Sequence, residues 1–394
     1  MKFTLISSCI ALAVMALAVE AAPNGKKINV PLTKNESYKP SAKRAIQKAN
    51  AKFHKHRLLT APSSGGVSSD GSTGLVPVTD YENDIEYYGQ VTVGTPGVTL
   101  KLDFDTGSSD LWFASTLCTN CGSSQTKYNP NKSSTYATDG RAWSISYGDG
   151  SSASGILATD TVNLGGLSIK KQTIELAKRE ATSFQSGPSD GLLGLGFDSI
   201  TTVNGVKTPV DNLISQGLIS NPVFGVYLGK ESNGGGGEYI FGGYDSSKFS
   251  GSLTTIPVDN SNGWYGITIK SSTVGSSKVS GSFSAILDTG TTLLILPNNV
   301  ASAVAKAYGA SDNYDGTYTI DCDTSNFKPL VFSIGSSTFE VPADSLVFEQ
   351  DGSTCYAGFG YGDYDFAIFG DVFLKNNYVV FNPKVPQVQI APIA

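Results

Sequence analysis

Histidine and methionine are nearly absent from the 394-residue chain, and the few that occur are confined to its beginning. The two histidines are His54 and His56, and the two methionines are Met1 and Met15. If this stretch is removed on maturation, the remaining protein has no imidazole. Catalysis by Ser-His-Asp or Cys-His groups, a histidine general base and histidine-ligated zinc are then excluded.

Charged residues are also scarce, at 16% of the chain, and they are unevenly distributed. Residues 1–69 carry eleven Lys and Arg against two acids, a net charge of +9, whereas residues 70–394 carry seventeen against thirty-two, a net charge of −15. The acidic body argues against a nucleic-acid partner. With 40% hydrophobic residues and 44 glycines, the chain can form a sizeable core and is more typical of β-rich proteins than of helical ones.

Long hydrophobic runs are limited to one, over residues 3–19, directly after Lys2. The small residues Val19 and Ala21 that end it are typical of signal-peptidase cleavage, so residues 1–21 are predicted to be a signal peptide. A membrane anchor is the alternative, but the run is short and lacks stop-transfer charges. No other stretch approaches the ~18 apolar residues of a membrane span. We therefore expect a secreted, extracellular protein without membrane contact.

The segment after the leader is basic, with ten Lys and Arg opposed only by Glu36 over residues 26–57. Within it, a helix is predicted from the capping residue Ser41 to Phe53. The Gly- and Ser-rich residues 61–74 that follow are suited to proteolysis. We interpret residues 22–69 as a propeptide that covers an acidic body of two lobes, residues 70–245 and 246–394. A basic arm for anionic surfaces is the alternative interpretation.

Four cysteines remain once Cys9 leaves with the leader, and four cysteines allow three pairings. Only Cys118–Cys121 and Cys322–Cys355 are local in sequence, each within one lobe, so we expect these two structural disulfides. A Cys-x-x-Cys redox or zinc motif is the alternative, but no second such motif and no mature histidine complete a metal site. We expect neither a metal nor a cofactor.

The body consists mainly of short alternating segments that are typical of half-buried strands. Strands are predicted over residues 98–104, 141–147, 161–167, 237–242, 265–270 and 378–381, and helices over residues 208–218 and 298–308. The sequence therefore predicts an all-β protein with a few short helices.

An internal repeat is the most informative feature of the body. Residues 102–109, Leu-Asp-Phe-Asp-Thr-Gly-Ser-Ser, are matched by residues 285–292, Ala-Ile-Leu-Asp-Thr-Gly-Thr-Thr. An apolar segment ending in glycine follows each copy, over residues 190–196 and 367–370. The repeat predicts two related lobes, each of which brings one aspartate, Asp105 or Asp288, to a shared cleft.

Two such aspartates can hydrolyse an amide without histidine or metal. If their carboxylates lie ~3 Å apart, Coulomb's law gives roughly 5 kcal/mol of repulsion, or about four pKa units. The pair then shares one proton, so one carboxyl can activate a water while the other donates to the carbonyl oxygen. The hydroxyls of Ser108 and Thr291 are positioned in sequence to reach the outer carboxylate oxygens. A single Asp-Thr-Gly is often a structural turn, but two copies with matching flanks favour this chemistry.

The chain resembles the pepsin-like aspartic proteases of the A1 type, and among them the secreted rhizopuspepsins of mucoralean fungi. The resemblance covers residues 26–394 and rests on the motifs at residues 26–32, 104–112, 147–151, 190–194 and 286–292. It implies a bilobal acid protease fold with a cleft between two related β lobes, and an aspartic endopeptidase made as a zymogen that acid activates. Asp105 and Asp288 match the catalytic aspartates that hold the nucleophilic water.

The resemblance also implies roles for residues around the pair. The substrate-binding positions are Tyr147, Gly148 and Asp149 on a flap hairpin, with Gly107, Gly290, Thr291 and Thr292 below it; Thr106, Ser108, Thr289 and Trp112 support the site. Lys52 matches the propeptide lysine that pairs with the catalytic aspartates, so the propeptide is expected to act as an intramolecular inhibitor. Protein and peptide substrates, inhibition by pepstatin-type compounds and a monomeric state are expected as well.

Two further features concern specificity and modification. Tyr-Gly-Asp-Gly is good turn chemistry, so Asp149 has a structural reading. In fungal relatives an aspartate here is associated with lysine at P1, so we expect broad specificity for apolar and aromatic P1 residues, extended to Lys. Asn35 and Asn131 begin glycosylation sequons, and only Asn131 persists after maturation.

Two other classes of function remain to be distinguished. A pepsin-like protein that has lost catalysis would serve as a binding module, but both Asp-Thr-Gly copies and the flap tyrosine are intact. A glycosidase would also use two carboxylates, but that interpretation does not account for the lobe repeat or the basic propeptide.

Overall fold

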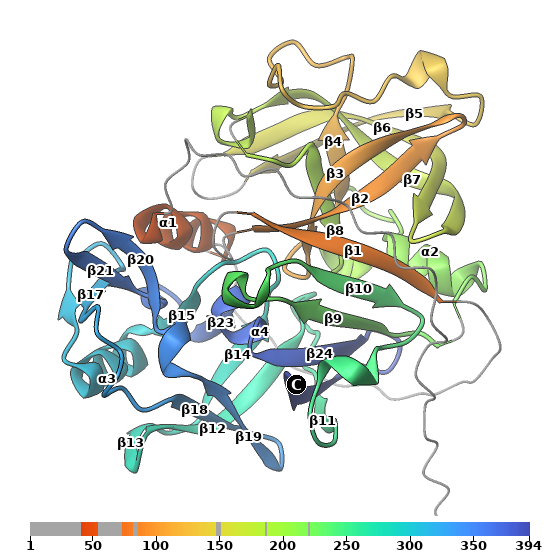
Figure 1. Cartoon of the computed structure of the whole chain (residues 1–394). Helices are drawn as coiled ribbons and strands as arrows, with labels where there is room; N and C mark the ends of the chain where they lie inside the picture. Colours follow the sequence, from red (N-terminus) through yellow and green to blue (C-terminus); the bar gives the residue numbers. More distant parts are fainter. Residues whose placement is uncertain (1–40, 54–72, 82–85, 147–150, 186, 220) are drawn as a thin grey trace, which may run out of the picture.

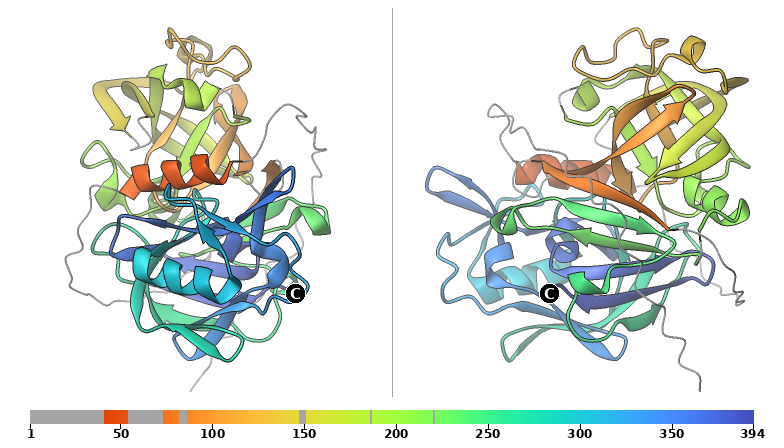
Figure 2. Two further views of the ribbon diagram at one scale, coloured as in Figure 1. Left: turned by 90° about the vertical axis from the view of Figure 1, so that its left-hand side faces the viewer. Right: turned by 45° about the vertical axis from the view of Figure 1, so that its right-hand side comes forward.

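The computed structural model describes residues 41–53, 73–81, 86–146, 151–185, 187–219 and 221–394. Figure 1 shows two strand-rich lobes, and the helix α1 (Ala42–Phe53) lies between them; the views in Figure 2 agree. This two-lobed arrangement of strands with few helices confirms the predicted fold class.

The first half of the body contributes ten strands and one short helix to the described residues. These are β1 (Gly74–Tyr81), β2 (Glu86–Gly94), β3 (Gly97–Asp105), β4 (Leu111–Ala114), β5 (Ala137–Ser146), β6 (Ser152–Leu164), β7 (Leu167–Glu180), β8 (Gly191–Gly194), α2 (Pro209–Ser215), β9 (Phe224–Leu228) and β10 (Gly237–Phe241).

The second half contributes the remaining described strands and helices. These are β11 (Thr254–Pro257), β12 (Gly266–Val274), β13 (Ser277–Ser280), β14 (Phe283–Leu287), β15 (Leu294–Pro297), α3 (Asn298–Tyr308), β16 (Ser311–Asp312), β17 (Tyr318–Ile320), β18 (Leu330–Ile334), β19 (Ser337–Val341), β20 (Val347–Asp351), β21 (Thr354–Ala357), β22 (Phe359–Gly362), β23 (Phe366–Phe369), α4 (Asp371–Leu374), β24 (Asn377–Asn382) and β25 (Gln387–Pro392).

One large sheet joins the two halves of the chain. Its order is β11-β25-β24-β9-β10-β1-β2-β3-β8-β4-β7-β6-β5, so strands from the end of the chain pair beside strands from its first half. The contact between the halves is antiparallel, with Val379 of β24 opposite Val226 of β9. Because the halves share a sheet, their Asp-Thr-Gly turns are held at a fixed separation.

The predicted repeat appears as two copies of one strand arrangement. In the first half, β3 is parallel to β8, and β4 is antiparallel to β8. In the second half, β14 is parallel to β23, and β15 is antiparallel to β23. Asp105 ends β3 and Asp288 directly follows β14, so each copy delivers its aspartate from the same position.

Local sequence explains where the helices begin and end. Thr208 and Asp211 form a capping box at the start of α2, with proline at its first position. Helix α3 spans residues 298–308 as predicted. It ends at Gly309, which adopts a positive φ of 67° and whose N–H donates to the carbonyls of Ala305 and Lys306. The short helix α4 was not predicted.

The strand predicted over residues 161–167 is wrong in its extent. Strand β6 ends at Leu164, and Gly165 and Gly166 turn the chain into β7, with φ angles of 59° and 88°. Glycine adopts such angles at little cost, so this pair makes a hairpin turn instead of continuing the strand.

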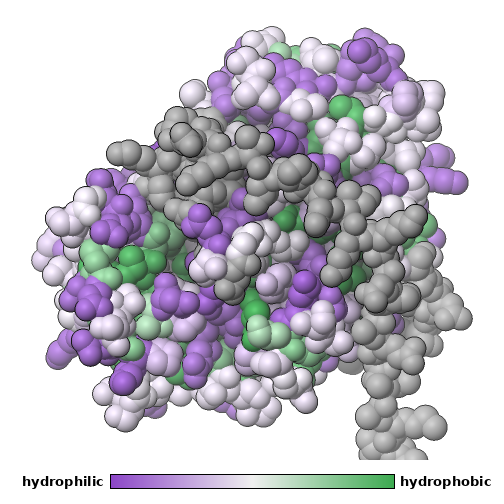
Figure 3. Space-filling model, viewed as in Figure 1, coloured by the Kyte–Doolittle hydropathy of each residue, from purple (hydrophilic) through white to green (hydrophobic). Residues whose placement is uncertain are grey.

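The core runs through both lobes, and the surface around it is mixed. Phe104, Phe224 and Phe332 are among the largest fully buried side chains. Figure 3 shows hydrophilic and hydrophobic residues interspersed on the face that it draws. No helix in the described part of the chain combines the length and apolar character needed to span a bilayer.

Both disulfides are present in the structure. Cys118–Cys121 joins two cysteines three positions apart after β4, and Cys322 is bonded to Cys355 of β21. Each bond lies within one half of the body and restricts a loop outside the central strands.

Candidate active site

The two Asp-Thr-Gly turns meet between the lobes and bond to each other symmetrically. The backbone N–H of Thr106 donates to the hydroxyl of Thr289, and the N–H of Thr289 donates to the hydroxyl of Thr106, each at 3.0 Å. The Thr106 hydroxyl donates to the carbonyl of Leu287 at 2.9 Å, and the Thr289 hydroxyl donates to that of Phe104 at 2.6 Å. Because each lobe satisfies the buried polar groups of the other, neither turn can shift alone.

The residues that follow the two threonines hold the two carboxylates with equivalent hydrogen-bond donors. The Gly107 N–H donates to Oδ1 of Asp105 at 2.8 Å, and the Gly290 N–H donates to Oδ1 of Asp288 at 3.1 Å. The hydroxyls of Ser108 and Thr291 donate to the respective Oδ2 atoms at 2.5 Å. Each carboxylate is therefore fixed by one backbone and one hydroxyl donor, and the inner oxygens face the space between the lobes.

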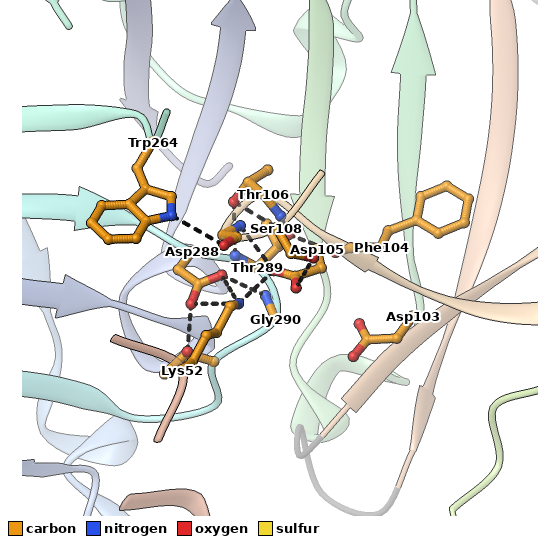
Figure 4. A network of polar contacts seen from close by, with 12 residues as sticks. Lys52, Asp103, Phe104, Asp105, Thr106, Ser108, Trp264, Asp288, Thr289 and Gly290 are labelled. Carbon is orange, nitrogen blue, oxygen red and sulfur yellow. Dashed lines mark hydrogen bonds and ion pairs between the residues drawn. The ribbon is translucent and has the colours of Figure 1, made fainter. Parts of the chain in front are cut away.

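The ammonium group of Lys52 occupies that space. Its Nζ lies 2.6 Å from Oδ1 of Asp105 and 2.9 Å from Oδ1 of Asp288, as Figure 4 shows. Since one nitrogen contacts both inner oxygens, the two carboxylates lie close to each other. All three groups are buried: the side chains are 7%, 2% and 0% exposed, respectively.

Burial and charge act in opposite directions on the pKa values of this trio. Burial favours the neutral acid, but the Lys52 ammonium lowers the pKa of Asp105 to about 2. Burial raises the pKa of Asp288, and the charge of Asp105 contributes in the same direction. Burial disfavours the ammonium, but the two carboxylates raise the pKa of Lys52. The site thus holds one carboxyl with a lowered pKa and one with a raised pKa around an ammonium group whose charged form the two carboxylates stabilise.

Glycine is required after each Asp-Thr because the opposite carboxylate comes very close. A Cβ on Gly107 would lie 2.5 Å from Oδ1 of Asp288, and one on Gly290 would lie 2.4 Å from Oδ1 of Asp105. No side chain fits there without displacing the pair. Of the neighbouring candidates, Thr291 is buried and Thr292 is partly buried.

Helix α1 closes the cleft with its apolar face. Ala42, Ile46, Ala49 and Phe53 are each at most 1% exposed, and their spacing places them on one side of the helix. The ring of Phe53 packs edge-on against Trp264, with centroids 5.1 Å apart. The ion pair of Lys52 is therefore sealed by hydrophobic contacts with the second lobe.

Trp112 is fully buried in β4, near Trp143 and Phe184. The flap candidates Tyr147, Gly148 and Asp149 lie outside the described residues. The hairpin that carries them, β5 and β6, is described, with Ser146 opposite Ser152 in register.

Two residues of the site were missed by sequence reasoning. The indole N–H of Trp264 donates to the carbonyl of Gly107 at 3.2 Å, and no motif surrounds this tryptophan. Asp103 lies two residues before Asp105, and Lys48 of α1 reaches to 3.8 Å from its Oδ2. The alternation of β3 was a signal for Asp103, because residues two apart on a strand share a face.

A two-lobed β-fold whose lobes each contribute one Asp-Thr-Gly carboxylate to a shared buried site is the architecture of an aspartic protease. Comparisons with known proteins agree. The pattern of the family described as eukaryotic aspartyl protease matches residues 86–393. The sequence is 87% identical to rhizopuspepsin-2 of Rhizopus niveus over the full length of both chains. It is 59% identical to syncephapepsin of Syncephalastrum racemosum over all of this chain and 99% of that one.

A solved structure gives the same result. The crystal structure of the aspartic proteinase from Irpex lacteus superimposes with a TM-score of 0.71 at 29% identity, covering 82% of this chain and 98% of that one. The chain belongs to the eukaryotic aspartyl protease family and, with it, to the pepsin-type aspartic endopeptidases, which excludes the glycosidase.

Proposed function

We propose that the chain is the zymogen of a secreted aspartic endopeptidase, and that acid activates it by releasing α1 from the cleft. The observation that carries this proposal is the Lys52 ammonium between Asp105 and Asp288. It occupies the position where a water would be held by both carboxylates in the active enzyme, so the helix blocks the chemistry as well as the cleft.

The hydrolysis follows from the donors around the pair. Ser108 and Thr291 donate to the outer oxygens, and Gly107 and Gly290 each donate to one inner oxygen. The remaining lone pair of each inner oxygen can then hold a water and one shared proton. The ionised carboxyl takes a proton from the water as its oxygen bonds to the peptide carbon, and the protonated carboxyl donates to the carbonyl oxygen. The carboxyl that took the water proton then passes it to the amide nitrogen as the C–N bond breaks. A hydroxyl of the tetrahedral carbon returns its proton to the other carboxyl as the carbonyl of the new acid forms, so the dyad again holds one proton.

Substrate contacts are proposed for both walls of the cleft. Gly290, Thr291 and Thr292 are proposed to bind the substrate main chain from the second lobe, together with Gly107 of the first. Tyr147 and Gly148 are proposed to close over the peptide from the flap, with Trp112 as the hydrogen-bond partner of Tyr147.

The pH dependence of activation follows from Asp105. Its pKa in the zymogen is lowered to about 2, below the value of 3.8 for an ordinary aspartate. Because the pKa of Asp105 is lowered in the closed form, this carboxylate stabilises the closed form at pH values above the ordinary pKa. That stabilisation is lost as pH falls from about 4 toward 2. Protonation of carboxylates on the acidic body also weakens the attraction for the basic propeptide. Acidification is therefore expected to release α1.

The first prediction tests the reaction class directly. After acid treatment, the protein should hydrolyse a denatured protein at about pH 3, because one carboxyl of the dyad is then protonated. Pepstatin should block this activity and a chelator should not. Hydrolysis that survives pepstatin, or no hydrolysis at all, would overturn the proposed function.

The second prediction concerns cleavage after lysine. Asp149→Thr should lower kcat/KM for a peptide with Lys at P1 about tenfold relative to a matched peptide with Phe, because the variant lacks the carboxylate that would pair with the ammonium. Asp139→Thr is the matched control, since it removes a carboxylate of the same hairpin that pairs with Arg141 instead. Equal losses on the Lys and Phe peptides would contradict this role for Asp149.

The remaining proposals concern processing. Residues 1–21 are proposed to direct secretion and residues 22–69 to be removed, with the cut between Ser64 and Gly74. The mature enzyme would be an extracellular monomer of two lobes, residues 70–245 and 246–394. Asn131 is exposed and lies in a 3₁₀ turn (Pro130–Lys132), which is accessible to glycosylation.

A further inference from the structure

Two buried acids of the first lobe, Asp110 and Glu175, take no part in the hydrolysis described above. Asp110 directly precedes β4 and is 2% exposed, and Glu175 lies in β7 and is 1% exposed. Strands β4 and β7 are parallel neighbours at the top of Figure 1, with Trp112 opposite Glu175 in register. Asp110 is two residues before Trp112, and the carboxyl groups of Asp110 and Glu175 are hydrogen-bonded to each other across the two strands.

The surroundings of Glu175 are apolar. Both of its carboxyl oxygens are buried, and neither accepts a hydrogen bond from a backbone amide, hydroxyl or cation of the described part of the chain. Glu175 is on the same face of β7 as Ala177, which packs in a hydrophobic cluster with Trp112, Trp143 and Leu192. An ionised carboxylate is strongly disfavoured in such a place, so Glu175 is held as the neutral acid.

Asp110 has the hydrogen-bond donors that Glu175 lacks. The backbone N–H and the hydroxyl of Thr202 donate to Oδ1 of Asp110 at 2.9 and 2.8 Å. Two carboxylates can only accept hydrogen bonds, so a bond between the two acids needs a proton on one of them. The protonated Glu175 therefore donates to the Asp110 carboxylate, and the bond exists only while the pair retains that proton.

The electrostatics of the pair agree with this geometry. Burial raises the pKa of Glu175 well above its ordinary value of 4.5, and the charge of Asp110 and their shared hydrogen bond act in the same direction. Burial also raises the pKa of Asp110, against the hydrogen bonds from Glu175 and Thr202 that lower it.

No cation of the described chain compensates the two acids. Strand β4 has no charged residue, and the charged residues on the other elements packed against β7 are Asp160 of β6, Asp198 and Lys207 of the segment after β8, and Asp211 of α2. Each of these has its own partner: Asp160 accepts from Tyr128, Lys207 pairs with Asp198, and Asp211 accepts from Thr208. None of them acts on Asp110 or Glu175.

Asp110 connects the pair to the catalytic turn. Its carbonyl accepts from the N–H of Gly194, and the next N–H along the chain, that of Leu195, donates to the carbonyl of Asp105. Ser108 is two residues before Asp110, and its hydroxyl donates to the carboxylate of Asp105. A shift of Asp110 therefore displaces the segment that fixes one of the two catalytic carboxylates.

We propose that Glu175 is a positioning residue whose protonated carboxyl, acting through Asp110, holds the Asp105 turn in place, and that loss of this proton inactivates the mature enzyme as pH rises. The folded form keeps a proton that the unfolded chain gives up near pH 4.5. The stabilisation is therefore complete in acid and is lost as pH rises from about 4.5 through the raised pKa of Glu175. Once both acids are ionised, two negative charges lie together in apolar surroundings, and β7 is driven away from the segment that precedes β4.

The experiment follows inactivation of the mature enzyme. It is incubated at pH values from about 4 to about 9 and returned to about pH 3, where hydrolysis of a denatured protein is measured. Glu175→Gln should raise the pH of half-inactivation by about one unit or more, because its amide N–H donates to Asp110 at every pH. Its kcat and KM at about pH 3 should stay within about twofold of the wild type, since the wild-type pair keeps the same bond there.

Glu340→Gln is the matched control, since it makes the same change at an exposed glutamate of β19 and should leave the pH of half-inactivation unchanged. If Glu175→Gln fails to fold, Asp110→Asn tests the same bond, because its amide donates to an ionised Glu175, and it should raise the pH of half-inactivation as well. The inference is overturned if the wild type and the folded variant are inactivated at the same pH. It is also overturned if the variant loses as much activity in acid as near neutrality, which is what a merely structural role would give.

The activity measurement rests on the proposed endopeptidase function, but circular dichroism during the incubation does not. The loss of folded structure should shift to higher pH in Glu175→Gln by the same amount as the loss of activity. A shift in neither signal refutes the role of Glu175 while leaving the endopeptidase function intact. Absence of hydrolysis at about pH 3 before any incubation would instead refute the endopeptidase function, and the dichroism would still test the pair.

Discussion

Asp288→Asn should leave the protein folded and lower its hydrolysis of denatured protein at about pH 3 by a factor of about 10⁴ or more. The amide has the same shape as the carboxyl and keeps an oxygen for the Gly290 N–H, which now donates to Oδ1 at 3.1 Å. It cannot share a proton with Asp105, however, so the water loses its base or the carbonyl loses its acid. General acid–base catalysis of this kind contributes about 10²–10⁴-fold for each proton transfer.

The measurement is the rate of hydrolysis by the acid-treated variant, with circular dichroism to verify folding. Asp351→Asn is the matched control, since it makes the same change at an exposed carboxylate of β20 and should retain full activity. If propeptide removal is autocatalytic, the Asp288→Asn chain should also keep its precursor length in acid. Activity within tenfold of the wild type would exclude Asp288 from the reaction.

Lys52→Met should cause helix α1 to leave the cleft at a higher pH than in the wild type. The substitution removes the cation that lies within 3.0 Å of both Asp105 and Asp288 and leaves two carboxylates buried beneath an apolar side chain. Breaking a buried ion pair by removing one partner costs about 3–5 kcal/mol. This cost destabilises the form in which α1 covers the cleft, because the carboxylates are hydrated once the helix leaves.

The test is the appearance of mature protein and of activity as pH is lowered in steps from 7 to 3. Wild-type activation is expected as pH falls below about 4, where the stabilisation from Asp105 begins to be lost, and Lys52→Met should activate at least about one unit higher. Lys43→Gln is the matched control on the same helix, because Lys43 forms an exposed ion pair with Asp315. Identical activation curves for Lys52→Met and the wild type would mean that Lys52 does not hold the helix closed.

The sequence predicted the site best where a motif and its repeat specified the same geometry. The two Asp-Thr-Gly copies predicted that Asp105 and Asp288 share a cleft, and the downstream glycine segments became β8 and β23, which pair with β3 and β14. The predicted helix after Ser41 also formed, and its amphipathic spacing explains why it docks.

Long-range pairing was much harder to predict than these local patterns. Nothing local to β24 indicates that it pairs with β9, more than 150 residues earlier, since pairing partners are chosen by the assembled core. Trp264 likewise joins the site through a turn that carries no motif. The strand predicted over residues 161–167 failed because two glycines were treated as strand residues when they form a hairpin turn.

The reciprocal bonds between Thr106 and Thr289 have the form of an isologous contact, in which the same group on each side makes the same bond to the other. Isologous contacts are the hallmark of two-fold symmetric homodimers. The central turns therefore preserve the geometry of a dimer of identical subunits within a single chain. Covalent fusion removes the requirement that the two copies stay identical, because each half can then change without altering the other. An aspartate at residue 103 opposite an isoleucine at residue 286 is a difference that a true homodimer could not carry.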